Sequence, residues 1–348
     1  LALFGVLSLL AAQPAEGSRG RYNKLYVVPV PGEVTIDGDL SEWDRSAEIE
    51  FYVVPETKAS QAARFNVMYD DEALYLGGVI RDNSPMMNRH DPEASGNKGW
   101  DADAIQFRLV TDAGAAYPLK ENQFKYRNMR NEQGKPLSKA EREARDQRDD
   151  IVHMTMWYYT DEQRPALQMH QGFTYRVPRE AWGPHGVVPG DLYEAAYKEQ
   201  EDGLGYRFEY RIPWSTLGAT ASLEGGDIVA GTVQVNWSRP DGLKTAGGAA
   251  WAYDVMSGPG FPFQSGECWG KLIFREQGDV PRELVDAGLP PEKPLPLAFK
   301  YNVPVDSEVT VQLMDADHNV VRTLVAQGKR NGGQNIEMWD GLSTTGEP

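Results

Sequence analysis

The chain has 348 residues and a formal net charge of −16, and 41% of its residues are hydrophobic. This composition excludes a disordered tail, a collagen and a bundle of membrane helices, and the acidic balance disfavours nucleic acid as a partner. The lone cysteine, Cys268, excludes a disulfide scaffold, a zinc finger and a thiol oxidoreductase. Many glycines, prolines and tyrosines with few helical runs predict an all-β protein.

An apolar run from Leu1 to Leu10 opens the chain, and the small residues Ala11 and Ala12 and a polar stretch follow it. The run is too short to span a bilayer and is typical of the apolar part of a signal peptide. A buried strand or short helix is the alternative. We assign residues 1–17 to a signal-peptide remnant and expect a secreted, periplasmic or cell-surface protein that has no transmembrane segment after cleavage.

Residues 18–276 form the main body. The segments 64–69 and 74–80 flank a tight turn at Asp70 and Asp71 and predict a hairpin. Further strand-like segments are 104–110, 151–159, 167–175, 192–200, 205–212, 228–237 and 269–274. Strands dominate without a βαβ rhythm, which predicts an antiparallel β-sandwich. Within 227–239, apolar Val233, Val235 and Trp237 alternate with polar residues, as in a half-buried strand.

A charged insertion at 113–150 interrupts the sandwich. Its residues Ser138 and Glu141 have the spacing of a capping box that opens a short helix. The insertion either offers a basic face to an acidic partner or is a solvated loop. Beyond the sandwich, a proline-rich stretch predicts a linker over 277–298. Residues 299–348 contain a predicted hairpin, with its second strand over 320–325, and are too few to complete a domain.

Five stretches of the main body resemble family-nine carbohydrate-binding modules and their relatives in the DOMON superfamily. The first is GEVTIDGDLSEW from Gly32 to Trp43, which also predicts a strand, an Asp-Gly turn and a tryptophan anchor. The others are DEALYL at 71–76 followed by Arg81 and Asp82, WDADAIQF at 100–107, GYRFEYRIPW at 205–214 and CWGKLI at 268–273. The resemblance implies the sandwich fold, and members of the superfamily bind sugars, haem or no known ligand.

The end of the chain resembles the immunoglobulin-like domain of the flagellar hook-capping protein. The similarity covers VTVQLMDADHNVVRTL at 309–324, the turn beginning Trp339-Asp340-Gly341, and Thr345-Gly346. It implies an incomplete immunoglobulin-like β domain that acts as a spacer within a longer polypeptide.

Sugar recognition requires aromatic surfaces for pyranose rings and planar polar groups for hydroxyls. Trp100, Trp182 and Trp251 lie in glycine- or proline-containing loops and are the candidate stacking residues, with Arg81 as a candidate hydroxyl ligand. Buried packing is the alternative for each tryptophan. Trp43, Trp214, Trp237 and Trp269 have strand or anchor contexts and are expected in the core.

Calcium and haem b are two candidate cofactors. Asp82, Asp101 and Asp103 concentrate oxygen donors suited to calcium, although their spacing matches no EF-hand. Met154, Met169 and His170 offer soft and imidazole ligands for haem b, as in relatives similar to the haem subunit of ethylbenzene dehydrogenase. Strand alternation places Met154 and His153 on opposite faces, and methionines more often fill a core.

We therefore predict an exported, non-catalytic carbohydrate-binding module that binds a polysaccharide or oligosaccharide. No catalytic motif is present in the sequence, so an enzyme is not expected, although the module could accompany a glycoside hydrolase within a larger protein. A haem-binding electron-transfer domain is the first alternative, and a structural cell-surface protein is the second. Glu209 is interpreted as a structural acid of the sandwich.

Overall fold

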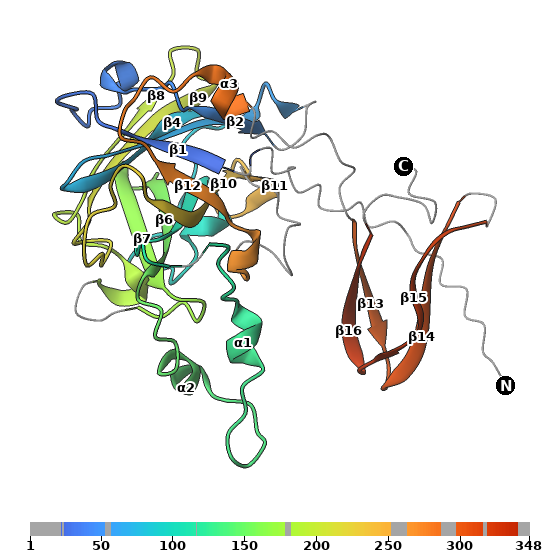
Figure 1. Ribbon diagram of the computed structural model, residues 1–348. Coiled ribbons are helices and arrows are strands. Elements are labelled where there is room, and N and C mark those ends of the chain that lie inside the picture. Colours follow the sequence, from blue (N-terminus) through green and yellow to red (C-terminus); the bar gives the residue numbers. More distant parts are fainter. Residues whose placement is uncertain are drawn as a thin grey trace. The chain divides into compact units, whose positions relative to one another are not determined.

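The computed structural model describes Tyr22 and residues 24–52, 57–115, 117–177, 182–251, 263–286, 297–315 and 319–339. These residues belong to two compact units, which meet in sequence at Pro290 and Pro291 (Figure 1). The predicted signal peptide lies outside the described residues. No helix within these ranges has the length and apolar character needed to cross a membrane.

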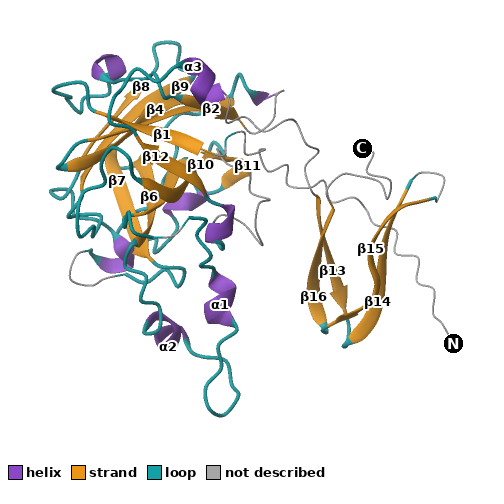
Figure 2. Cartoon of the chain, in the orientation of Figure 1, coloured by secondary structure: helices purple, strands orange, loops and turns teal. Residues whose placement is uncertain are grey.

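The larger unit consists mainly of strands (Figure 2). They are β1 (Lys24–Pro29), β2 (Ile49–Tyr52), β3 (Gln61–Tyr69), β4 (Ala73–Asp82), β5 (Ala104–Val110), β6 (Ile151–Tyr159), β7 (Arg164–Gln171), β8 (Glu194–Glu199), β9 (Gly205–Pro213), β10 (Ile228–Ser238), β11 (Thr245–Trp251) and β12 (Gly270–Phe274). Its short helices are α1 (Gln123–Arg127), α2 (Lys139–Glu143) and α3 (Arg282–Asp286).

The strands form a sandwich of two sheets that share β1. The first sheet has the order β7-β6-β5-β10-β12-β1, with β11 also paired to β10. The second has the order β1-β3-β4-β9-β8, with β2 also paired to β3. Lys24 to Val27 pair with β12, whereas Val28 and Pro29 pair with β3, so β1 passes from one sheet to the other. Both β1 pairings are parallel, and in this respect the sandwich differs from the fully antiparallel prediction.

Aromatic side chains fill the space between the sheets. The ring of Phe107 on β5 lies 5.7 Å from that of Phe65 on β3, which in turn lies 6.1 Å from Phe208 on β9. The indole N–H of Trp237 on β10 donates to the backbone oxygen of Arg81 on β4 at 2.8 Å. These contacts join the two layers and confirm the predicted sandwich.

Most of the predicted strands are present. The hairpin around Asp70 is confirmed as β3 and β4, and the predicted strands 104–110 and 151–159 coincide with β5 and β6. The predicted strand 167–175 ends early, because the chain turns at Gly172 and Tyr175, both of which have positive φ. Residues 32–36 were expected to form a strand but lie in a loop. The expected anchor Trp43 is buried against Gly77.

The charged insertion carries α1 and α2. The Ser138 hydroxyl accepts from the backbone N–H of Glu141, and the Glu141 side chain accepts from the backbone N–H of Ser138, which confirms the predicted capping box. The expected linker over 277–298 differs from the prediction in its first part, which contains a helix and packs on the sandwich. Helix α3 forms there, and Val280 and Val285 are buried against the sandwich, because this stretch places apolar side chains at positions that face the core.

The second unit contains four strands: β13 (Leu297–Val303), β14 (Ser307–Met314), β15 (Val320–Arg330) and β16 (Gly333–Trp339). β13 pairs with β16 and β14 pairs with β15, all antiparallel. The β14–β15 pair confirms the predicted hairpin. Residues 340–346 lie outside the described residues, and the immunoglobulin-like resemblance of this unit stays a prediction.

Candidate functional site

Two rows of polar side chains lie on the outer face of the first sheet, across the neighbouring strands β7, β6, β5 and β10. Because strand residues alternate between faces, these side chains point away from the core that Phe107 and Val233 enter. The register gives one row of Gln168, Thr155, Gln106 and Gln234 and a second row of His170, His153, Arg108 and Thr232. We call these eight side chains the polar grid.

The polar grid is mostly buried and partly connected by hydrogen bonds. Of its members, only Gln106 is partly exposed. Gln106 Nε2 donates to Thr155 Oγ1 at 3.1 Å, and Arg108 Nη2 donates to Gln106 Oε1 at the same distance. Gln106 therefore links two neighbouring strands at the more accessible side of the grid.

Several buried atoms of the grid have no hydrogen-bond partner among the described residues. They are both ring nitrogens of His153, Oε1 of Gln168 and Oγ1 of Thr232. Buried polar atoms in folded proteins normally have a partner from the chain or from ordered water. Four such atoms on one sheet face therefore indicate a surface suited to a polar partner.

The two histidines of the grid are held in the neutral form. Burial lowers the pKa of His153 well below its usual range, and the positive charge of Arg108 lowers it further. Burial, together with the charge of Lys139, lowers the pKa of His170 to about 4. A neutral imidazole has one N–H donor and one acceptor nitrogen. At neutral pH these rings can thus donate and accept hydrogen bonds without contributing charge.

Aromatic rings surround the histidine side of the grid. Tyr175 stacks on His153 with a ring separation of 4.4 Å, and Phe173 and Trp269 meet the same imidazole edge-on at 5.4 and 5.6 Å. The Tyr175 hydroxyl donates to the backbone oxygen of Phe263 at 2.5 Å. The grid is therefore closed at this end by Phe173 and Tyr175, on the turn after β7, and by Trp269, directly before β12.

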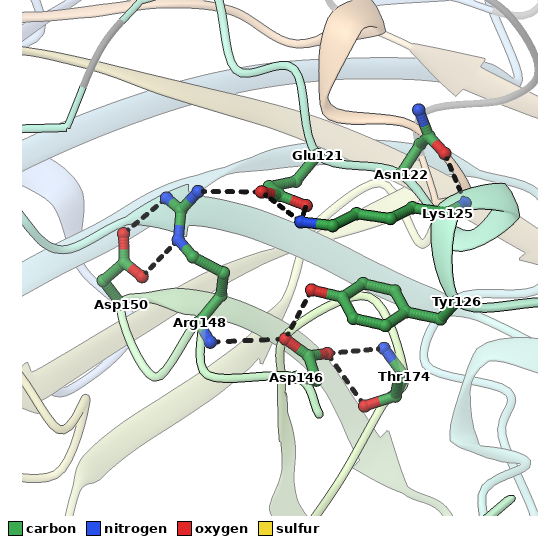
Figure 3. Close-up of polar contacts among 8 residues, drawn as sticks. All are labelled: Glu121, Asn122, Lys125, Tyr126, Asp146, Arg148, Asp150 and Thr174. Carbon is green, nitrogen blue, oxygen red and sulfur yellow. Dashed lines mark hydrogen bonds and ion pairs between the residues drawn. The ribbon is translucent and has the colours of Figure 1, made fainter. Parts of the chain in front are cut away.

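Asp146 of the charged insertion holds that turn in place (Figure 3). Its carboxylate accepts from the Tyr126 hydroxyl at 3.2 Å and from the backbone N–H and hydroxyl of Thr174 at 2.9 and 2.8 Å. A Cβ atom at Gly172 would collide with this carboxylate, and Gly172 has φ +64°, so the turn requires glycine there. The insertion thus positions the loop that bears Tyr175.

Trp100 lies at the opposite end of the grid, in a 3-10 helix over Gly99–Asp101. Its side chain is 43% exposed, and its indole N–H donates to the backbone oxygen of Asn97 at 3.0 Å. Asn236 connects it to the grid, because this amide donates to the Trp100 backbone oxygen and accepts from Gln234, both at 2.7 Å. Trp100 therefore offers an open aromatic surface at the rim of the grid.

Two of the other predicted sugar-binding residues, Trp182 and Arg81, do not join Trp100. Trp182 is 4% exposed and belongs to the core cluster, so its ring offers little open surface. Trp251 pairs with Gln234 through the backbone, and its side chain lies outside the described part of the chain. Arg81 lies on the second sheet and forms an ion pair with Asp202 at 2.9 Å. The role of each in binding stays a prediction.

The three predicted calcium ligands are engaged in two separate interactions. Burial raises the pKa of Asp82 and Asp103, and repulsion between their carboxylates helps to hold the pKa of Asp103 well above its usual range, which favours a proton on the pair. Asp101 instead forms an ion pair with Lys244. Within the described ranges, no three acidic, histidine or cysteine side chains are grouped to hold a metal. Calcium stays a prediction.

The proposed haem ligands lie on two faces of the first sheet. Met154 and Met169 are register partners whose side chains are buried in the core. His170 pairs with His153 on the outer face, where strand alternation places both. A single iron cannot reach both faces of a sheet, so the structure does not bring these three residues into one ligand set.

Sequence reasoning missed most of the polar grid. A signal was present, because polar residues occupy alternate positions in three predicted strands: Gln106 and Arg108, His153 and Thr155, and Thr232 and Gln234. Only in the last of these was the alternation recognised. Strand order was needed to place the three pairs side by side.

No protein-family model matches the chain, and no curated protein matches it. Among solved structures, the chain is similar to a family 9 carbohydrate-binding module from Caldicellulosiruptor kristjanssonii in complex with glucose and to one from the same organism in complex with cellotriose. Each match has 16% sequence identity and a TM-score of 0.45. The matches cover 74% and 78% of this chain and 98% and 100% of the respective modules.

Proposed function

We propose that this chain is a non-catalytic carbohydrate-binding protein and that the polar grid, with Trp100 at its rim, binds the sugar. The proposal is carried by the unpartnered buried atoms on one sheet face: the His153 nitrogens, Gln168 Oε1 and Thr232 Oγ1. Leaving a buried donor or acceptor without a partner costs about 1 to 3 kcal/mol each, a cost that a bound polar ligand would offset.

The chemistry of the grid suits hydroxyl groups. Amide side chains and neutral imidazoles both donate and accept hydrogen bonds, as sugar hydroxyls do. Arg108 is the one charged member of the grid, and its planar guanidinium adds several donors. Trp100 supplies an apolar ring face of the kind that packs on the C–H face of a pyranose. This combination favours a neutral sugar over a strongly charged ligand.

The exposure pattern suggests how a sugar would enter. The grid spans four strands, or roughly 14 Å at the usual strand spacing. Tyr175 closes its histidine end, whereas partly exposed Gln106 and exposed Trp100 lie toward the other end. A ligand entering there would contact Trp100 and Gln106 first and reach the histidines only if the turn around Tyr175 moves. We further propose that the module acts as part of a longer exported protein.

Calorimetric titration tests the assignment. The full chain is screened against neutral oligosaccharides, including glucose and cellotriose, and the tightest binder is then titrated against the Gln106→Met variant. Methionine keeps an unbranched side chain of similar length but removes the amide. We expect the variant to bind about ten-fold more weakly, the scale of one or two lost hydrogen bonds.

Gln133→Met is the matched control, because Gln133 is an exposed amide at the tip of the charged insertion. This variant should bind the sugar as the parent protein does. The proposal fails if no neutral sugar binds to the parent chain, or if Gln106→Met retains full affinity while folding normally.

A further inference from the structure

A polar cavity lies on the outer face of the second sheet. It has a volume of about 240 Å³ and is lined by Arg45, Arg64 and Arg207, with Ser41 and Gln200 contributing neutral polar groups. We call it the arginine cavity. A volume of this size exceeds that of several water molecules, so a small polyatomic group fits inside it.

Strand register brings the basic residues together. Arg64 on β3 pairs with Val79 on β4, and Val79 pairs with Arg207 on β9. These three side chains share the outer face, so the two guanidinium groups flank the short apolar side chain of Val79. Arg45 approaches from the loop after a 3-10 helix at Leu40–Glu42. The cavity is therefore built on three neighbouring strands, β3, β4 and β9, and on the segment that covers them.

The arginines exceed the carboxylates available to them. Arg45 donates through Nε and Nη2 to one oxygen of Glu48, at 2.7 and 2.5 Å, and Arg64 lies 3.9 Å from the other oxygen. Arg207 forms no ion pair with any residue that the structure describes, and its Nε atom is buried without a hydrogen-bond partner. The carboxylate of Asp39 also lines the cavity, where it accepts from the backbone N–H of Ser41 at 3.1 Å.

We propose that the arginine cavity binds an oxyanion, the carboxylate, sulfate or phosphate group of an anionic ligand. Guanidinium groups are planar and present several donors in a fixed geometry, which matches oxyanions and allows paired hydrogen bonds. The Nε donor of Arg207 has no hydrogen-bond partner among the described residues, although the chain has a net charge of −16 and therefore many carboxylates that could pair with an arginine. The source of the oxyanion is either a charged substituent on a polysaccharide or a free inorganic anion.

This site goes beyond the proposed function. The polar grid belongs to the first sheet and contains one guanidinium group, whereas the arginine cavity belongs to the second sheet and contains three. Loss of one site should therefore leave the other intact, and the two proposals can fail separately.

Titration of the full chain with sodium sulfate and with sodium phosphate, at an ionic strength held constant with sodium chloride, tests the proposal. We expect saturable binding at one site for at least one of these anions, and a matching rise in Tm. Arg207→Gln should weaken that binding at least ten-fold. Arg207→Lys keeps the charge but loses the planar donors, so its affinity should be intermediate. Arg127→Gln, at an exposed arginine of α1, should change nothing.

A sulfated oligosaccharide and its neutral parent sugar then identify the source. Tighter binding of the sulfated sugar than of both sulfate and the neutral sugar, with loss in Arg207→Gln, assigns the cavity to a polysaccharide substituent. Equal affinity for sulfate and the sulfated sugar assigns it to a free anion. The proposal is overturned if neither sulfate nor phosphate binds above the chloride background, or if folded Arg207→Gln binds as Arg127→Gln does.

Discussion

Glu209, on the outer face of the second sheet, and the polar grid, on the outer face of the first, use their buried polar atoms differently. On the second sheet, the buried carboxylate of Glu209 accepts from the backbone N–H of Asp37 at 3.0 Å, from that of Gly38 at 2.5 Å and from the Trp43 indole at 2.7 Å. On the first sheet, the polar grid keeps several atoms without partners among the described residues. A buried polar side chain whose hydrogen bonds are all made within the chain stabilises the fold, whereas one with unused atoms is available to a ligand.

This difference predicts where mutations affect stability and where they affect binding. Figure 1 shows the strands involved, with β4, β8 and β9 of the second sheet together and β6 and β7 of the first sheet together. Changes at Glu209 should loosen the segment that covers the second sheet. Changes at Trp100 should alter binding with little effect on the fold.

The largest expected effect is on stability at Glu209. Glu209→Ala leaves three donors without an acceptor, in a place where the side chain is 0% exposed. We expect a loss of about 3 to 5 kcal/mol in the free energy of unfolding, measured by denaturant titration. Glu199→Ala, at an exposed acid of β8, should change stability by less than about 0.5 kcal/mol. Equal effects of the two variants would contradict the structural role of Glu209.

A smaller effect, dependent on pH, is expected at His170. The pKa of this buried ring is about 4 in the folded chain, whereas in the unfolded chain it has its usual value near 6.5. Between these values the unfolded state binds more protons, so the contribution of His170 to stability is full above pH 6.5 and is lost as the pH falls toward 4. The loss amounts to about 3 kcal/mol in total.

His170→Asn removes this titration, so its unfolding free energy should fall less steeply than that of the parent chain between pH 6.5 and 4. The lowered pKa of His153 acts in the same direction as that of His170, and the raised pKa values of Asp82 and Asp103 act in the opposite direction. Because these other groups are present in both proteins, the difference between the slope of the parent chain and that of His170→Asn reports the contribution of His170. Gln133→Met, at an exposed amide of the charged insertion, is the control. Parallel pH profiles for parent and His170→Asn would contradict a buried neutral ring.

The smallest expected effect on stability is at Trp100. Because its side chain is 43% exposed, Trp100→Ala should lower the free energy of unfolding by less than about 1 kcal/mol. Sugar affinity should fall by about 1 to 3 kcal/mol, measured by calorimetric titration. Phe124→Ala, at a similarly exposed ring on α1, should leave affinity unchanged. A stability loss of about 3 to 5 kcal/mol would instead indicate a core role for Trp100.

Much of the fold could be predicted from local patterns. The strand-like segments 104–110 and 151–159 were predicted with the observed bounds, and Asp70 with Asp71 marked the β3–β4 turn. The strand expected over 32–36 did not form, because Glu209, far along the chain, binds the backbone of the loop that follows it. Local sequence carries no information about an acceptor 172 residues away.

The sequence by itself determined that the chain is rich in strands, which of their positions are apolar and where the tight turns lie, because side chains alternate along a strand and turns select particular residues. Only the tertiary structure decided which strands are neighbours. The polar grid depends on β6, β5 and β10 lying side by side, and the arginine cavity depends on β3, β4 and β9 doing so. Both arrangements join residues more than a hundred positions apart, such as Gln106 with Gln234 and Arg64 with Arg207, and strand pairing over such separations is fixed by the packing of the whole core.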